Sequence, residues 1–313
     1  MIDEKDKQIL FELFQDARKS NKTIAKDLRI PERTIANRIN KMIEDEVITK
    51  FTSIVNYQNL GYNRHSIYFD LKHIEIDVMQ KKVEEITKID KISCCYVLHE
   101  VSHWKLYVSI WTKTIGEYDK IQTKVLKILK DYVMDYVSFQ SVRSYTYLSR
   151  LLNPKKIAKC DVKEETKDVE ISEEEKKLIE ILHKDSRKPL LEIAQELGVH
   201  TDTIKRKIKR LQKEDVLQRF YPLVDFTKMG IREYTFICRL NASHDDKIEK
   251  FIKWARANPH FVIVIKAVGW VNLYYAFQTE NDQQFKEIRS QINKMIGDII
   301  LKEYRIEVEK ILQ

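Results

Sequence analysis

The chain has 313 residues, of which 43% are hydrophobic and 33% are charged. This balance excludes an intrinsically disordered chain and suits two or three globular domains. The formal charge of +8 favours an acidic partner, of which nucleic acid is the commonest, while a merely soluble surface rich in Lys and Glu is the alternative.

The cysteines show neither the spacing of a zinc site nor a disulfide framework. We find no signal peptide and no apolar run long enough to cross a bilayer, so we expect a cytoplasmic protein without a metal or cofactor. The neighbours Cys94 and Cys95 are interpreted as buried strand and turn residues and not as a redox pair. The other two cysteines are Cys160 and Cys238.

The first 44 residues predict three helices. Residues 3–16 predict a helix that Asp3 caps, with Asp6 in its first turn and an apolar face for the core. A short helix follows at 22–28, and Pro31 opens a third at 32–44. The third helix has a buried face of Ile35, Ile39, Met42 and Ile43, and an exposed face of Arg33, Thr34, Asn37, Arg38 and Lys41. A short helix followed by a turn and a helix with a cationic exposed face is typical of a helix-turn-helix. We therefore expect the exposed face of the third helix to contact DNA.

The stretch ITKFTSIVNY after this helix predicts a pair of short strands that form a wing. Its Thr49, Lys50 and Thr52 are candidates for phosphate contacts, as are Gln218 and Arg219 in a later copy. Wings usually position a protein on DNA and seldom read its sequence.

From Ser66 the apolar residues alternate, which predicts a strand. A helix at 78–89, strands at 92–98 and 106–112, a helix at 118–132 and a strand at 133–147 complete a βαββαβ order, which indicates a ferredoxin-like domain. The polar segment 153–170 after it is interpreted as a flexible linker.

The chain then repeats itself. Residues from Ile2 onward align without a gap over those from Ile171 onward, pairing Arg18 with Arg187 and Gly61 with Gly230. The second copy predicts strands and helices at 234–240, 247–257, 261–268, 273–279, 285–296 and 299–308. The fold class is therefore α+β, with winged helix-turn-helix domains at 1–60 and 171–229, ferredoxin-like domains at 61–152 and 230–313, and a linker at 153–170.

The second copy has the more basic recognition helix, TDTIKRKIKRLQK, which carries six cations and a single acid, Asp202. A short helix and Gly198, which allows a tight turn, precede it. A solvated basic face is the alternative, but the position of this helix favours contact with DNA. The candidate contacts are Thr201, Thr203, Lys205, Arg206, Lys207, Lys209, Arg210 and Lys213.

The segments DEKDKQILFELFQDARKSNKTIAKDL, RTIANRINKMIEDEVITKF and VNYQNLGY resemble the Lrp/AsnC regulators of bacteria and archaea. So do the second-copy segments KKLIEILHKDSRKPLLEIAQELGV, DTIKRKIKRLQKEDVLQRF and VDFTKMGI. The resemblance implies a transcriptional regulator whose ferredoxin-like domain, of RAM type, dimerises and binds an effector, usually an amino acid. Because the unit occurs twice, the chain looks like a dimer made covalent, and further pairing with another chain into a dimer or higher oligomer remains open.

In that family the loop between the second and third strands of the ferredoxin-like domain carries a Gly, two residues and an Asp. The first copy here has neither residue, and the second keeps only Gly269. The candidate effector contacts at these loops are Ser102, Trp104, Gly269, Trp270 and Asn272. The tryptophans are either a stacking site for a planar ligand or, as we favour, packing residues.

Two further patterns bear on enzymatic function. The sequence HEVSH at 99–103 matches a zinc-hydrolase motif, but its flanks alternate as strands, and extended chain would hold His99 and His103 too far apart to share an ion. Proteins that resemble this family also decarboxylate sirohaem, a tetrapyrrole that His103 and nearby Trp and Arg residues could serve. We rank this enzyme, and a scaffold without DNA affinity, below a regulator.

Overall fold

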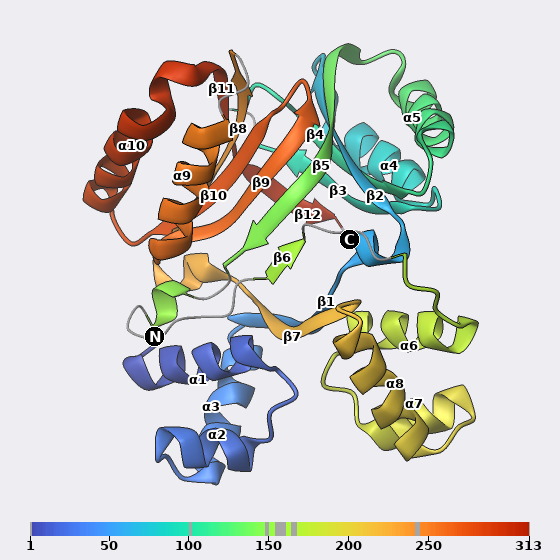
Figure 1. Ribbon diagram of the computed structural model, residues 1–313, viewed down its shortest axis with the longest axis vertical. Helices are drawn as coiled ribbons and strands as arrows, with labels where there is room; N and C mark the ends of the chain where they lie inside the picture. The colour runs from blue at the N-terminus through green and yellow to red at the C-terminus, as the bar shows by residue number, and fades with distance from the viewer. Residues whose placement is uncertain are drawn as a thin grey trace.

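The computed structural model describes residues 2–99, 102–147, 150–153, 161–163, 168–241 and 245–312. These ranges form an α+β protein, as predicted, in which two three-helix heads lie beside a large strand-rich body (Figure 1). None of the described helices is both long enough and apolar enough to cross a lipid bilayer.

The first unit begins with a head of three helices, α1 (Glu4–Gln15), α2 (Asn21–Leu28) and α3 (Glu32–Glu44). Asp3 caps α1 by accepting from the Lys5 and Asp6 backbones, and the Asp6 carboxylate returns a bond to the Asp3 backbone. The remaining elements are β1 (Ile48–Val55), η1 (Tyr57–Leu60), β2 (Asn63–Leu71), α4 (Ile76–Thr87), β3 (Ile92–Leu98), β4 (Leu106–Thr112), α5 (Ile115–Leu129), β5 (Val133–Thr146), η2 (Arg150–Leu152) and β6 (Asp161–Lys163).

The second unit repeats this order. Its head is α6 (Glu173–Lys184), α7 (Leu190–Leu197) and α8 (Thr201–Lys213). The remaining elements are β7 (Leu217–Val224), η3 (Phe226–Met229), β8 (Arg232–Leu240), α9 (Asp245–Ala257), β9 (Phe261–Gly269), β10 (Leu273–Thr279), α10 (Asp282–Ile296), η4 (Gly297–Ile299), β11 (Ile300–Ile306) and β12 (Val308–Leu312). The last strand, expected as one segment at 299–308, is therefore two strands separated by Glu307.

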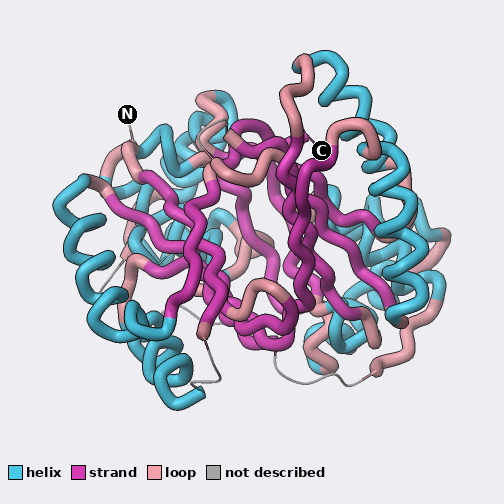
Figure 2. Tube along the Cα trace, turned by 90° about the horizontal axis from the view of Figure 1, so that it is seen from above, coloured by secondary structure: helices cyan, strands magenta, loops and turns pink. Residues whose placement is uncertain are grey.

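The strands of the two units join into one sheet in the order β11-β8-β10-β9-β5-β2-β4-β3-β12. Each unit supplies a half-sheet of four strands, and β5 pairs with β9 across the units. Because β12 follows β11 along the chain and pairs with β3, the chain itself connects the two ends of this strand order. In Figure 2 the helices flank the strands on both sides. A shared core that includes Tyr68, Trp104 and Ile237 fills the space between the half-sheets.

The two heads are joined by β1 and β7, which pair antiparallel beneath the half-sheets (Figure 1). The predicted wing is therefore wrong: the segment after α3 is a single strand whose partner belongs to the other unit. Each strand also completes the core of the opposite head. Phe51 and Val55 of β1 pack with the second head, and Tyr221 and Val224 of β7 pack with the first. The heads are thus held in one fixed arrangement.

The segment interpreted as a linker is only partly described. Residues 154–160 and 164–167, with Cys160 among them, lie outside the described residues. Between them β6 pairs antiparallel with β5, joining Tyr145 to Val162. The expectation of coil throughout 153–170 was wrong for this strand, whose three residues are too short to give a periodic pattern.

Candidate nucleic-acid interface

The second head has the geometry of a helix-turn-helix. Helix α7 ends at Gly198, whose φ of 67° lies in the left-handed region that glycine adopts without strain. The turn is closed by the Val199 backbone, which donates to the Ala194 carbonyl at 3.0 Å. The first head makes the same turn with Arg29 at φ 56°, a position that costs a side chain about 1 kcal/mol.

Helix α8 buries Ile204, Ile208 and Leu211, and its other faces carry the six cations. Three of these are ion-paired: Lys205 with Asp202 at 3.0 Å, Lys207 with Glu174 at 3.4 Å and Arg210 with Glu175 at 2.5 Å. The other three are exposed and have no ion-pair partner among the described residues; they are Arg206, Lys209 and Lys213. Thr201 and Thr203 are part-buried at the start of the helix.

The ion pair of Arg210 ties α8 to α6. Burial would raise the pKa of Glu175, but hydrogen bonds from Arg210 and from the Ser172 backbone outweigh it and lower that pKa. A second guanidinium nitrogen of Arg210 donates to the Glu170 carbonyl at 3.0 Å. This arginine is therefore committed to the fold of its own head, although 46% of its side chain is exposed.

In the first head the equivalent face of α3 is nearly neutral. It has three cations, and the helix carries two acids, Glu32 and Glu44. Arg38 bonds to Asp3 at 2.9 Å and to Asp6 at 2.8 Å, and these bonds raise its pKa. Arg33 and Lys41 remain exposed without an ion-pair partner in the described ranges. Thr34, Asn37, Arg38 and Lys41 line one depression of about 380 Å³ together with the carboxylates Asp3, Asp6 and Asp45.

Two other predicted contacts lie on the paired strands. Lys50 of β1 is part-buried, whereas Arg219 of β7 has only 3% of its surface exposed and donates to the Phe14 carbonyl at 3.4 Å. A side chain enclosed between the heads cannot reach a phosphate, so Arg219 is withdrawn as a DNA contact. The same strand pairing buries Thr52.

One residue of α3 also differs from the prediction. Ile43, predicted to be buried, is 43% exposed, because α3 turns that side to solvent.

The residues predicted as effector contacts lie together between the half-sheets. The Trp104 and Trp270 rings are 6.2 Å apart, and both contact Tyr304. Trp104 is only 1% exposed and Ser102 only 3%, so neither offers a surface to a ligand. Asn272 accepts from the Leu240 backbone at 3.0 Å, next to the Gly269 turn. The structure gives Ser102 and Trp104 a packing role, which contradicts their use as effector contacts.

The described part of the HEVSH segment, His99 and 102–103, follows β3 and contains no helix. The ring of His103 stacks on Tyr304 at 4.8 Å. Within the described ranges, no group of three His, Cys, Asp or Glu side chains is placed to hold a metal ion. Cys95 is fully buried in β3, and burial raises the pKa of its thiol to about 12.

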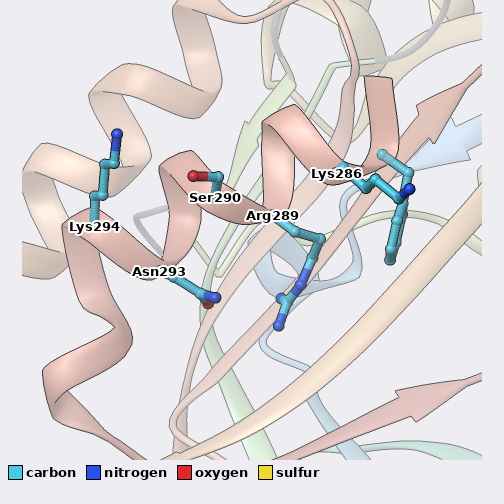
Figure 3. A pocket seen from close by; sticks show the side chains of 6 residues that line it. Lys286, Arg289, Ser290, Asn293 and Lys294 are labelled. Atoms are coloured by element: carbon cyan, nitrogen blue, oxygen red, sulfur yellow. The ribbon is translucent and has the colours of Figure 1, made fainter. Parts of the chain in front are cut away.

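A second depression, of about 570 Å³, lies on α10 (Figure 3). All of its lining residues come from this one helix, and its central cation, Arg289, is paired with the Glu303 carboxylate. Tyr275 donates to the same carboxylate at 2.6 Å. The arginine therefore serves the core of the second half-sheet and offers little charge to the depression.

Comparisons with known proteins agree with the geometry of the heads. Residues 2–49 match the model for winged helix-turn-helix DNA-binding domains, and residues 175–212 match the model for the AsnC-type helix-turn-helix domain. The second head is thus similar to the helix-turn-helix domain of the AsnC type, and the first to winged helix-turn-helix DNA-binding domains. The chain carries the same succession of elements twice.

Among its relatives is an uncharacterized HTH-type transcriptional regulator of Pyrococcus abyssi, 39% identical over 100 residues. The match spans 31% of this chain and 64% of that relative. A second uncharacterized HTH-type transcriptional regulator, from Pyrococcus furiosus, is 29% identical over 146 residues, which are 46% of this chain and 96% of the relative. That relative is about the length of one of the two units of this chain.

The whole two-unit fold also occurs in a solved structure. The siroheme decarboxylase NirDL superposes with a TM-score of 0.62 at 17% identity, over 98% of this chain and 91% of that one. At this identity the likeness shows a shared fold.

Sequence reasoning missed the carboxylates that hold the recognition helices. Asp6 and Glu175 occupy matching positions of the repeat, each at the start of the first helix of its head, and each pairs with an arginine of the third helix. An acid at both positions was the available signal, but capping alone explained it.

Proposed function

We propose that this chain is a sequence-specific DNA-binding transcriptional regulator that reads DNA with α3 and α8. The exposed and unpaired cations of α8 carry the proposal, because a recognition helix must leave positive side chains free to neutralise phosphates or reach base edges. Arg206, Lys209 and Lys213 meet this requirement. The supporting comparison is with relatives described as HTH-type transcriptional regulators.

The two heads are proposed to contribute unequally. Helix α8 offers three unpaired cations, whereas α3 offers two beside a depression that contains three carboxylates. We therefore assign most of the phosphate affinity to α8, and assign Asn37 and Thr34 of α3 to the reading of bases. The chain would act as a covalent pseudo-dimer on an asymmetric operator.

We further propose that the regulator works in the cytoplasm, and that 1–60 and 171–229 act as reading heads while 61–152 and 230–313 join them. Light scattering at several protein concentrations measures whether two chains associate. The rival function, decarboxylation of sirohaem, rests on a shared fold alone. Incubation with sirohaem should leave its absorption spectrum unchanged, and a product spectrum would favour the enzyme.

The direct test is selection of bound fragments from random DNA, followed by titration of the selected site. The triple variant R206A/K209A/K213A should lose at least about a hundredfold in affinity and flatten the dependence on salt by roughly three phosphate contacts. Matched substitutions at exposed lysines of α4 and α5, K81A/K120A/K124A, should leave both the affinity and the salt dependence unchanged. Equal affinity of the two triple variants would reject α8 as the DNA-contacting helix.

A further inference from the structure

Asn37 and Arg206 occupy matching positions of the two recognition helices. Each is the sixth residue of its helix, in the half that a helix-turn-helix presents to base edges. Each also lies midway between two buried isoleucines, which are Ile35 and Ile39 in α3 and Ile204 and Ile208 in α8. Successive residues of an α-helix are about 100° apart, so a residue at this place points directly away from the core. Both side chains are exposed.

The outward stripe that continues from these positions differs in charge between the heads. On α8 it passes through Lys209 and Lys213, and on α3 the matching residues are Asn40 and Glu44. All four are exposed, so packing against the core does not require this difference. Arg206 therefore lies on a cationic stripe that attracts phosphates, whereas Asn37 is followed by an uncharged and an acidic residue.

The two side chains suit different bases. Among the described residues, neither side chain makes a hydrogen bond or an ion pair, so both are available to a ligand. A guanidinium donates two parallel N–H groups, which match the N7 and O6 acceptors of guanine in the major groove. A carboxamide donates one hydrogen bond and accepts another, which matches N7 and the N6 amino group of adenine.

The junction between the heads fixes the distance between these two side chains. β1 of the first unit pairs with β7 of the second (Figure 1). Val55 of β1 packs into the core of the second head, and Val224 of β7 packs against the core of the first. The heads cannot move apart without opening both cores. Both helices must therefore meet one DNA duplex at a constant spacing.

We propose that the operator has two unlike half-sites at one fixed spacing, with a guanine read by Arg206 in one and an adenine read by Asn37 in the other. This inference rests on the proposed function and specifies the bases that are read. Lys209 and Lys213 then contact phosphates beside the guanine. A guanidinium in the groove also displaces counterions, so salt dependence does not identify the role of Arg206, and base preference does.

The test is selection of bound fragments from random DNA by the full chain, followed by titration of the selected site and of its single-base changes. Arg206→Gln replaces the guanidinium by a carboxamide. At one position the preference should change from guanine to adenine, and affinity for the parent's site should fall at least about tenfold. Asn37→Ala should lose an adenine preference of at least about tenfold in the other half-site. Inserting two base pairs between the two positions should weaken binding of the parent to a similar extent.

Two substitutions serve as controls. Lys209→Ala removes a phosphate contact and should weaken binding to all sequences about equally. Arg256→Gln makes the same chemical change at an exposed position of α9 and should bind as the parent does. If Arg206→Gln does not fold, the parent decides with 7-deazaguanine, which lacks the N7 acceptor, placed at each guanine of the site in turn. One such replacement should weaken binding at least about fivefold.

Four results would overturn the inference. They are a selected site with two identical half-sites, an Arg206→Gln chain that keeps the parent's preference at every position, both variants altering the same position, and equal affinity after the insertion. Binding of DNA by the parent without any sequence preference would instead reject the proposed function, and this inference with it.

Discussion

Arg18 of the first head lies over the ring of Phe220 in the second, with its guanidinium carbon 5.6 Å from the ring centroid. The repeat makes the same contact in reverse, because Arg187 lies 5.1 Å over the ring of Phe51. Arg18 also donates to the Ser186 carbonyl at 2.6 Å, and Arg187 donates to the Asn21 amide oxygen at 3.3 Å. The two arginines fasten the heads to each other around the β1–β7 pair.

Removing both arginines should loosen this junction. We expect R18A/R187A to lower the free energy of unfolding by about 2 to 4 kcal/mol, since each arginine contributes hydrogen bonds from a charged donor and a cation–π contact. Denaturant unfolding measures the loss, and hydrogen exchange should become faster in β1 and β7. Unchanged exchange there would show that the strand pairing alone joins the heads.

Arg38 and Arg33 lie on the same helix and should respond differently to removal. Arg38→Ala leaves the carboxylate of Asp6, which is only 7% exposed, without its partner, so we expect a loss of roughly 2 kcal/mol in stability. Arg33→Ala should leave stability unchanged. The Arg33→Ala variant should instead bind DNA more weakly. With one phosphate contact fewer, the slope of log affinity against log salt concentration should fall by about 0.9. A larger loss of DNA affinity in Arg38→Ala than in Arg33→Ala would contradict this assignment.

Local signals explain what the sequence predicted well. The bounds of α8 follow from the spacing of Ile204, Ile208 and Leu211 and from the glycine turn before it. The partner of β1 was missed because strand pairing between Phe51 and Pro222 depends on contacts far apart in the chain, which no short pattern encodes. A wing, in which the strand would pair with its neighbour in the sequence, was what the local pattern suggested instead.

For the candidate site too, local patterns were predictable and contacts between distant residues were not. The cationic faces of α3 and α8 were evident from periodicity, but the state of each cation was not. Arg210 and Arg206 have the same charge and similar exposure, and only Glu175, from another helix, distinguishes them. Equally, nothing in the sequence near Arg219 indicated that the opposite head would enclose it.

His65 should make the stability of the fold depend on pH. It is 5% exposed, its ring stacks on Tyr118 at 4.1 Å, and burial lowers its pKa to about 4. The unfolded chain binds this proton from near pH 6.5 downward, whereas the folded chain does so only near pH 4. Stability is therefore fully present above pH 6.5 and falls by at most about 3 kcal/mol as the pH drops toward 4.

The measurement is denaturant unfolding at several pH values. His65→Phe keeps an aromatic ring against Tyr118 and should remove this part of the pH dependence. His73→Phe is the control, because 86% of the His73 side chain is exposed. If His65→Phe and the parent lose stability in parallel between pH 6.5 and 4.5, the histidine is not the responsible group.

Gly269 should be the least replaceable glycine of the sheet. Its φ is 119°, and a Cβ added there would lie 2.8 Å from the Ser138 carbonyl oxygen on β5 of the other unit. The strand cannot move away without disturbing the β5–β9 pairing that joins the half-sheets, so Gly269→Ala should lower the free energy of unfolding by at least about 2 kcal/mol.

Gly116→Ala is the matched control, because no atom lies within 4 Å of its added Cβ and it occupies the first turn of α5. Alanine there should raise stability by about 0.5 to 1 kcal/mol. Thermal unfolding of both variants distinguishes a local helix effect from a defect at the junction between the units, and equal melting temperatures would refute the close approach of Gly269 to β5.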